Sequence, residues 1–164
     1  MAAVVLLKRR SVVTFSAIAV ALGGCAPSIH SARGWGHLEE KNPDRAIEAF
    51  QRGGEGPGAL VGLSHAYFQK GDYTKAEAFL DEAVRRYPND WFVLFSKGQY
   101  CLDIKKEYDT AIQYLKRSQQ LEQGSASKEI GLLIQEAKRK MADSQTDQLH
   151  PPKKPPDSRH KSIK

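Results

Sequence analysis

The chain has 164 residues, of which 40% are hydrophobic and 27% are charged, enough for one modest domain with extensions. Its formal charge of +6 suggests a nucleic acid or a membrane as a partner. However, Cys25 to Leu149 contains 17 basic and 18 acidic residues, a net charge of −1, so the excess lies at the two ends. The central part has the mixed charge of a solvated surface, and we expect no nucleic-acid partner.

The first 25 residues have the pattern of a secretory signal. Lys8, Arg9 and Arg10 precede a mostly apolar run, residues 11–22. A helix needs about 20 apolar residues to span a bilayer, so this run is too short. Its length and its basic flank are typical of the hydrophobic core of a signal peptide.

The end of this segment, Leu22-Gly23-Gly24-Cys25, resembles the lipobox of bacterial lipoproteins. The resemblance implies a signal peptide over 1–24, a lipid on Cys25 and a short tether over 25–30. By the same resemblance, Ala26 after the cysteine favours the periplasmic face of the outer membrane, or the cell membrane where there is only one. The alternative is an ordinary signal or anchor with an incidental cysteine.

A first pair of helices is expected after the tether. Apolar residues, among them Trp35 and Leu38 with His37 beside them, indicate a helix from about Ser31. Asn42-Pro43-Asp44 then gives a cap followed by proline at a helix start, and a second apolar stripe of Ala46, Ile47, Ala49 and Phe50 follows. The glycine-rich stretch 53–58 lacks a preceding strand and a following Lys-Ser/Thr, which favours a linker over a phosphate-binding loop.

Residues 57–90 contain the clearest pattern. Two apolar stripes at helical spacing are separated by Gly71-Asp72, and Pro88 ends the second, with Asn89 or Asp90 able to cap the next helix. This stretch resembles the tetratricopeptide repeat, a helix-turn-helix of about 34 residues. The residues in its signature positions are Leu60, Leu63, Ser64, Tyr67, Ala76, Leu80 and Pro88. We expect small Ala76 and Ala83 to lie where helices touch.

A third pair of helices and a terminal helix follow. The third pair runs from Trp91 to about Gly124, with Lys97 in a position expected to be apolar and one extra residue between Gly98 and Ala111. We expect the turn at 105–109 to absorb this insertion. Residues 125–141 carry one more apolar stripe, formed by Ile130, Leu133, Ile134, Ala137 and Met141.

The sequence therefore predicts an all-α fold. It is a short solenoid of two to three tetratricopeptide repeats with a terminal capping helix, covering residues 31–142. Residues 143–164 contain two Pro-Pro steps and no apolar periodicity, which predicts a disordered tail rich in proline and lysine. We expect the tail to increase solubility, and the alternative is weak attraction to anionic lipid, lipopolysaccharide or cell-wall phosphate.

No catalytic or metal-binding pattern is present. The five histidines have no ligand-like spacing, and there is no nucleophile elbow. Cys101 is expected to be a buried, inert thiol between helices, and a redox role is the alternative. We therefore expect no enzyme activity, no metal and no cofactor besides the lipid on Cys25.

The resemblance also implies a binding face. In tetratricopeptide repeat proteins the first helix of each repeat lines a concave groove. The residues of this chain that correspond to the groove are Val61, His65, Phe68, Phe92, Phe95, Gln99 and Leu102. These residues are mostly apolar or aromatic, which suits a hydrophobic peptide segment. The alternative is that Phe92 and Phe95 pack into the core.

The resemblance to lipid-anchored tetratricopeptide repeat proteins implies a scaffold function. The chain is expected to bind an envelope protein or peptide during assembly of a cell-envelope complex, such as a pilus or secretion machine. The alternative is an adaptor that localises or regulates peptidoglycan hydrolases or proteases.

Overall fold

The structure is a computed structural model of the chain and describes residues 29–149. These residues form seven α-helices, one π-helical turn and no strand. The elements are α2 (Ile29–Glu39), α3 (Pro43–Arg52), α4 (Pro57–Gln69), α5 (Tyr73–Arg86), α6 (Trp91–Tyr100), η1 (Cys101–Lys105), α7 (Tyr108–Leu121) and α8 (Ser127–Leu149). The predicted all-α class is confirmed within this part of the chain.

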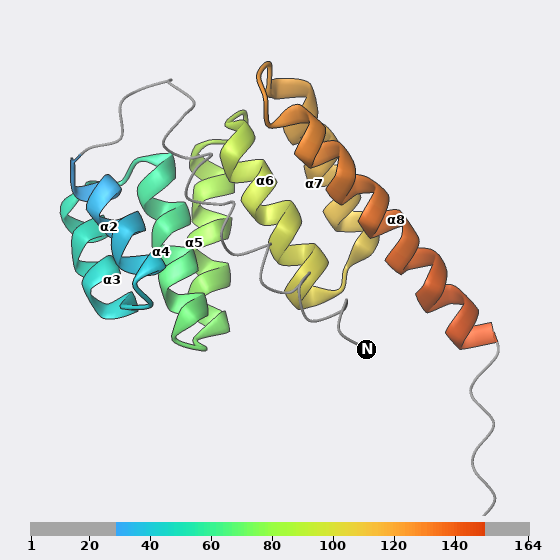
Figure 1. Ribbon diagram of the computed structural model, residues 1–164, viewed down its shortest axis with the longest axis horizontal. Helices are drawn as coiled ribbons and strands as arrows, with labels where there is room; N and C mark the ends of the chain where they lie inside the picture. Colours follow the sequence, from blue (N-terminus) through green and yellow to red (C-terminus); the bar gives the residue numbers. More distant parts are fainter. Residues whose placement is uncertain (1–28, 150–164) are drawn as a thin grey trace, which may run out of the picture.

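The helices form three antiparallel pairs that stack side by side, with α8 at the end of the stack (Figure 1). We call α2, α4 and α6 the A helices, and α3, α5 and α7 the B helices. Each A helix packs against the B helix that follows it, and α8 packs against α7. A pair of this kind cannot bury its own apolar faces, and stacking supplies the missing neighbours.

Three helices begin at side-chain caps, and the sequence predicted those of α3 and α6. The Oδ1 atoms of Asn42, Asp72 and Asp90 accept backbone N–H groups at the starts of α3, α5 and α6, respectively. Such side-chain caps satisfy amides that have no partner within the helix. Gly71 separates α4 from α5 with a φ of +78°, a conformation that glycine adopts without steric cost.

The core divides into two clusters. The N-terminal cluster is centred on α2 to α5, and Phe50, with no exposed surface, lies within it. The C-terminal cluster joins α6, α7 and α8 and contains Leu115 and Ile130, which also have no exposed surface. Phe92 packs against both clusters and therefore connects them. Ala76 and Ala83 have no exposed surface, which agrees with their predicted place between helices.

The extra residue of the third pair lies earlier than predicted. We expected the turn at 105–109 to absorb it, but α6 continues into the π-helical turn η1, whose wider ring of backbone atoms accommodates an inserted residue. Lys106 follows with a φ of +59°, and the N–H of Glu107 donates to the carbonyl of Cys101 at 3.0 Å. The insertion is therefore taken up at the end of α6 rather than in the loop.

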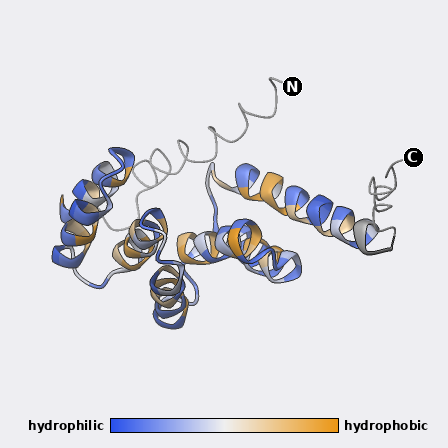
Figure 2. Cartoon of the chain, turned by 90° about the horizontal axis from the view of Figure 1, so that it is seen from below, coloured by the Kyte–Doolittle hydropathy of each residue, from blue (hydrophilic) through white to orange (hydrophobic). Residues whose placement is uncertain are grey.

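The terminal helix is longer than predicted. Its predicted apolar face is confirmed, because Ile130, Ile134 and Ala137 are buried and Met141 is partly buried against the C-terminal cluster. However, α8 also includes residues 143–149, which we had placed in the tail. These residues have no apolar stripe, and good helix formers such as Gln145 continue the helix without one. Figure 2 shows that hydrophobic residues gather in the first half of α8.

Several predictions fall outside the described residues. They concern the signal peptide over 1–24, the lipid on Cys25, the tether as far as Ser28, and the tail from His150. The tether was also predicted to include Ile29 and His30, which belong to α2. No helix among residues 29–149 is long and apolar enough to span a membrane.

Candidate functional site: the face of the A helices

Aromatic rings connect the three A helices. The ring of Trp35 on α2 lies 5.5 Å from that of His65 on α4 and 6.0 Å from that of Phe92 on α6, measured between centroids. Trp91 extends the set, at 5.8 Å from Phe92 and 6.4 Å from Phe95. We call these five residues the aromatic row. Because Trp35 reaches Phe92 past the intervening helix α4, the A-helix side of the stack is tightly closed.

The predicted groove is therefore only partly open. Val61 and Leu102 have no exposed surface and Phe95 is 4% exposed, so these three residues belong to the core. Phe92 is half-buried between the two clusters, as in the alternative that we left open. With only three helix pairs, the rings of the first and third A helices meet, and this contact leaves no continuous apolar channel.

Three of the predicted groove residues are at least partly exposed to solvent. His65 and Gln99 are half-buried, and Phe68 is 37% exposed. Phe68 makes an edge-to-face contact with Tyr73, which is 51% exposed, at 5.5 Å between ring centroids. Together with half-buried Trp91 and Phe92, these residues form the accessible part of the A-helix side. We call the set of Trp91, Phe92, His65, Gln99 and Phe68 the A-helix face.

Gln99 carries a buried acceptor. Its side-chain oxygen Oε1 is buried and has no hydrogen-bond partner. Buried polar atoms are nearly always paired, because an unpaired one loses its hydration without replacement. A donor from a bound chain would satisfy Gln99 Oε1, but reaching this buried atom requires the side chains around it to move.

Burial also changes the acid–base behaviour of His65. Desolvation lowers the pKa of its imidazole from 6.5 to about 4. The ring is consequently neutral at physiological pH and adds no charge to the A-helix face. The accessible groups of this face are thus apolar, aromatic or uncharged, which favours an uncharged segment of a partner.

Lys97 occupies a position that the repeat pattern predicts to be apolar. The structure shows how a charged side chain is accommodated there. Its Nζ lies 2.6 Å from Oδ1 of Asp81 and 3.9 Å from Oε1 of Glu77, both on α5. Burial lowers its pKa, but the hydrogen bond to Asp81 and the attraction of the carboxylates outweigh this effect, so the pKa is raised. The charge of Lys97 is thus compensated by α5 and is not part of the A-helix face.

Cys101 is buried with 2% exposure, as predicted. Burial raises the pKa of its thiol, which lowers the fraction of reactive thiolate at neutral pH. Among residues 29–149, no group of three or more His, Cys, Asp or Glu side chains has a geometry that could hold a metal ion.

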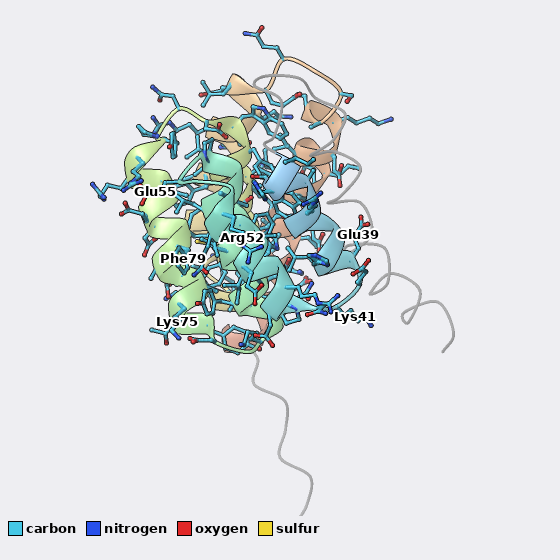
Figure 3. All side chains as sticks on the ribbon, turned by 90° about the vertical axis from the view of Figure 1, so that its left-hand side faces the viewer. Glu39, Lys41, Arg52, Glu55, Lys75 and Phe79 are labelled. Atoms are coloured by element: carbon cyan, nitrogen blue, oxygen red, sulfur yellow. The ribbon has the colours of Figure 1, made fainter. Side chains whose placement is uncertain are left out.

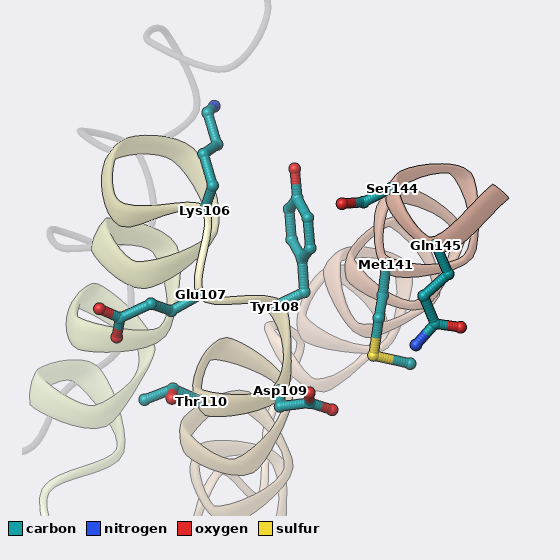
Figure 4. A pocket seen from close by; sticks show the side chains of 8 residues that line it. All are labelled: Lys106, Glu107, Tyr108, Asp109, Thr110, Met141, Ser144 and Gln145. Atoms are coloured by element: carbon teal, nitrogen blue, oxygen red, sulfur yellow. The ribbon is translucent and has the colours of Figure 1, made fainter. Parts of the chain in front are cut away.

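A hollow lies at the C-terminal end of the stack. It has a volume of about 400 Å³ and lies between the end of η1, the first turn of α7 and the second half of α8 (Figure 4). Its lining consists of Lys106, Glu107, Tyr108, Asp109, Thr110, Met141, Ser144 and Gln145. The hollow marks the place where α8 leaves the packed body of the solenoid.

Comparison with known families agrees with this architecture. The sequence model of the family described as Tetratricopeptide repeat matches residues 37–92, which include the second half of the first helix pair and all of the central pair. The fold is a short tetratricopeptide repeat solenoid. Repeats of this kind are interaction modules, which suggests that the chain binds other proteins. No curated protein matches the chain.

The sequence did not reveal which residues hold the first repeat together. A side-chain carbon added at Gly34 would lie 2.6 Å from the ring of Phe50, and one added at Gly62 would lie 2.3 Å from it. Phe50 therefore fills a space that two glycines on α2 and α4 leave open. Gly34 precedes Ala46 by the same twelve positions that separate Ser64 from Ala76, and this spacing could have identified it.

Proposed function

We propose that this protein is a membrane-anchored, periplasmic scaffold that binds an uncharged, largely apolar segment of a cell-envelope protein. The solenoid fold supports the general role of binding proteins. The anchor and the compartment rest on the sequence alone, namely the signal-peptide pattern and its resemblance to a lipobox ending at Cys25. Assembly of an envelope complex, such as a pilus or secretion machine, is the role that this combination favours.

One observation supports binding at the A-helix face more than any other. Gln99 presents a buried acceptor without a partner, on the same helix as half-buried Trp91 and Phe92. An extended peptide supplies both of the groups that such a surface lacks, a backbone N–H donor and an apolar side chain. Aromatic side chains in partly desolvated surroundings are also the residues that most often dominate binding energy.

We do not expect the A-helix face to recognise its partner through a terminal carboxylate. No lysine or arginine belongs to the A-helix face as defined, and the nearest candidate on α6, Lys97, is paired with Asp81. His65 is neutral because its pKa is lowered. A carboxylate placed here would lose its hydration without a cation to compensate it.

The test combines two substitutions on the A-helix face, Phe68→Ser and Gln99→Leu. Neither should unfold the protein, because Phe68 is exposed, Gln99 is half-buried, and leucine removes the unpaired oxygen. We expect proteins that co-purify with the membrane-attached wild type to be lost from the double variant. The melting temperature should stay within a few degrees.

Leu132→Ser is the matched control, because Leu132 is 64% exposed but lies on α8, away from the A helices. It should retain every partner. If the double variant folds normally and still retains the partners, binding at the A-helix face is contradicted. If the proteins that co-purify with the wild type are peptidoglycan hydrolases or proteases, the function of this protein is to localise those enzymes and not to assemble an envelope complex.

A further inference from the structure

One long edge of the solenoid gathers several ends of the helices. Figure 1 shows the start of α2 and the α3–α4, α5–α6 and α7–α8 connections along the upper side, whereas the α2–α3 and α4–α5 connections and η1 lie below. We call this upper side the anchor edge, because the chain enters α2 there. Figure 3, turned about the vertical, places Glu55 toward the anchor edge and Lys41 and Lys75 toward the opposite edge.

Two exposed apolar side chains lie on the anchor edge. Ile29 is 62% exposed at the first position of α2, and Leu121 is 37% exposed at the last position of α7. They come from opposite ends of the stack but from the same edge. Each one exposes apolar surface, Ile29 more than Leu121, at a cost to the folded protein in water.

Arginines follow the same edge. Five of the seven in residues 29–149 lie there: Arg33 near the start of α2, Arg52 at the end of α3, Arg85 and Arg86 at the end of α5, and Arg117 near the end of α7. Arg117 donates to Oδ1 of Asn89 in the α5–α6 connection at 2.9 Å, which fixes it at this edge. The planar guanidinium group binds phosphate with two parallel hydrogen bonds.

Carboxylates also belong to this edge and reduce its net charge. Glu48 pairs with Arg52 at 4.0 Å, Glu82 with Arg85 at 2.6 Å, and Glu55 with Arg86 at 2.5 Å. These are exposed ion pairs, which contribute little to stability and leave guanidinium N–H groups available. Attraction to a surface therefore depends on phosphate hydrogen bonds and apolar contacts rather than on a large positive charge.

The distance to the predicted anchor limits where this edge can lie. Four residue steps separate Cys25 from Ile29, and an extended chain of that length spans at most about 14 Å. A lipid on Cys25 places this residue at the level of the headgroups, where the polar layer is roughly 5–8 Å thick. The start of α2 must then lie in or just above that layer.

From these observations we infer that the anchor edge docks on the phospholipid headgroups, so that the solenoid lies along the membrane on this edge. This inference rests on the proposed lipid on Cys25. Ile29 and Leu121 enter the interfacial layer, and the arginines between them bind phosphates. The A-helix face then opens sideways, parallel to the membrane, and the α4–α5 turn lies on the edge away from the membrane (Figure 1).

The test uses the full lipidated protein in vesicles of phosphatidylethanolamine and phosphatidylglycerol. Single cysteines introduced by Ile29→Cys, Leu121→Cys, Tyr73→Cys and Leu132→Cys are labelled with a fluorophore. Buried Cys101 has a raised pKa and should remain unlabelled in the folded protein. A lipid that carries a quencher near its headgroup then reports which labels contact the membrane.

We expect quenching of about twofold or more at positions 29 and 121, and none at positions 73 and 132. Position 121 shows whether the anchor edge lies on the membrane, since position 29 is held near the bilayer by the anchor in any orientation. If position 121 is not quenched in protein that carries acyl chains on Cys25, the edge does not dock and the solenoid stands on its first repeat. If mass spectrometry finds no acyl chain and the protein does not float with vesicles, the proposed anchor fails, and this inference fails with it.

Discussion

The two core clusters are built in different ways although they share one repeat pattern. In the N-terminal cluster the ring of Phe50 fits between Gly34 on α2 and Gly62 on α4, so two A helices and one B helix meet at a single side chain. In the C-terminal cluster Gly98 meets Leu115, but α6 ends in a π-helical turn and α8 packs only as far as Met141. The repeat signature therefore specifies which helices pair, whereas individual contacts decide how tightly each pair closes.

The largest effect should come from truncating the side chain at the centre of the N-terminal cluster. Phe50→Ala removes a ring with no exposed surface and should cost about 3–5 kcal/mol of unfolding free energy. Because each repeat contacts mainly its neighbours, hydrogen exchange should accelerate more in α2 to α4 than in α7 and α8. Leu115→Ala, at a cost of about 2–5 kcal/mol, should reverse this pattern. Equal acceleration everywhere would show that the clusters are not separate.

Acid should weaken the N-terminal cluster through His65. The pKa of its imidazole is about 4 in the folded protein and about 6.5 when it is solvated. Below pH 6.5 the unfolded chain binds a proton that the folded chain does not, so stability falls as the pH drops from about 6.5 to 4. The loss at the acid end is on the order of 3 kcal/mol.

Chemical denaturation at a series of pH values measures this loss. His65→Gln is the matched control, because a neutral amide has no proton to bind in this range. If the wild type and this variant lose stability in parallel below pH 6.5, the ring of His65 is not desolvated.

A pair of glycines on α2 tests how closely the first repeat is packed. Gly34→Ala brings a methyl group against the ring of Phe50 and should destabilise the protein by about 1–3 kcal/mol. Gly36→Ala, two residues away on the same helix, meets nothing within 4 Å and should stabilise it by about 0.5–1 kcal/mol through helix propensity. Thermal denaturation of both variants should therefore move the melting temperature in opposite directions. A shift of the same sign would contradict the packing of Phe50.

The smallest effect concerns Lys97, at the contact between α5 and α6. Asp81→Asn removes the closest partner of this nearly buried ammonium but leaves Glu77 at 3.9 Å, so we expect a cost of about 1 kcal/mol. Lys97→Met removes the charge and keeps the apolar stem, which should be neutral or stabilising. Urea denaturation distinguishes the two variants. A larger loss from Lys97→Met would mean that the ion pair stabilises the fold.

The sequence predicted the elements of the solenoid well because helix caps and apolar stripes are local signals. Asn42, Asp72 and Asp90 cap the predicted helices, and the buried positions of α8 match the predicted stripe. The same kind of signal could not show that Trp35 reaches Phe92, because this contact depends on the curvature of the whole stack. For that reason Val61, Phe95 and Leu102 were placed in a groove, although the structure buries them.

The central claim is that partners bind at the A-helix face, and photo-crosslinking in living cells tests it most directly. A benzophenone amino acid replaces Phe68 on α4, and in separate variants Gln113 on α7 and Leu132 on α8, all of which are exposed. We expect position 68 to form a discrete adduct with a partner protein and the other two positions to form none. The Gln99→Leu substitution should weaken that adduct. Adducts from position 113 or 132 without one from position 68 would contradict the claim and place the binding surface on the outer side of the solenoid.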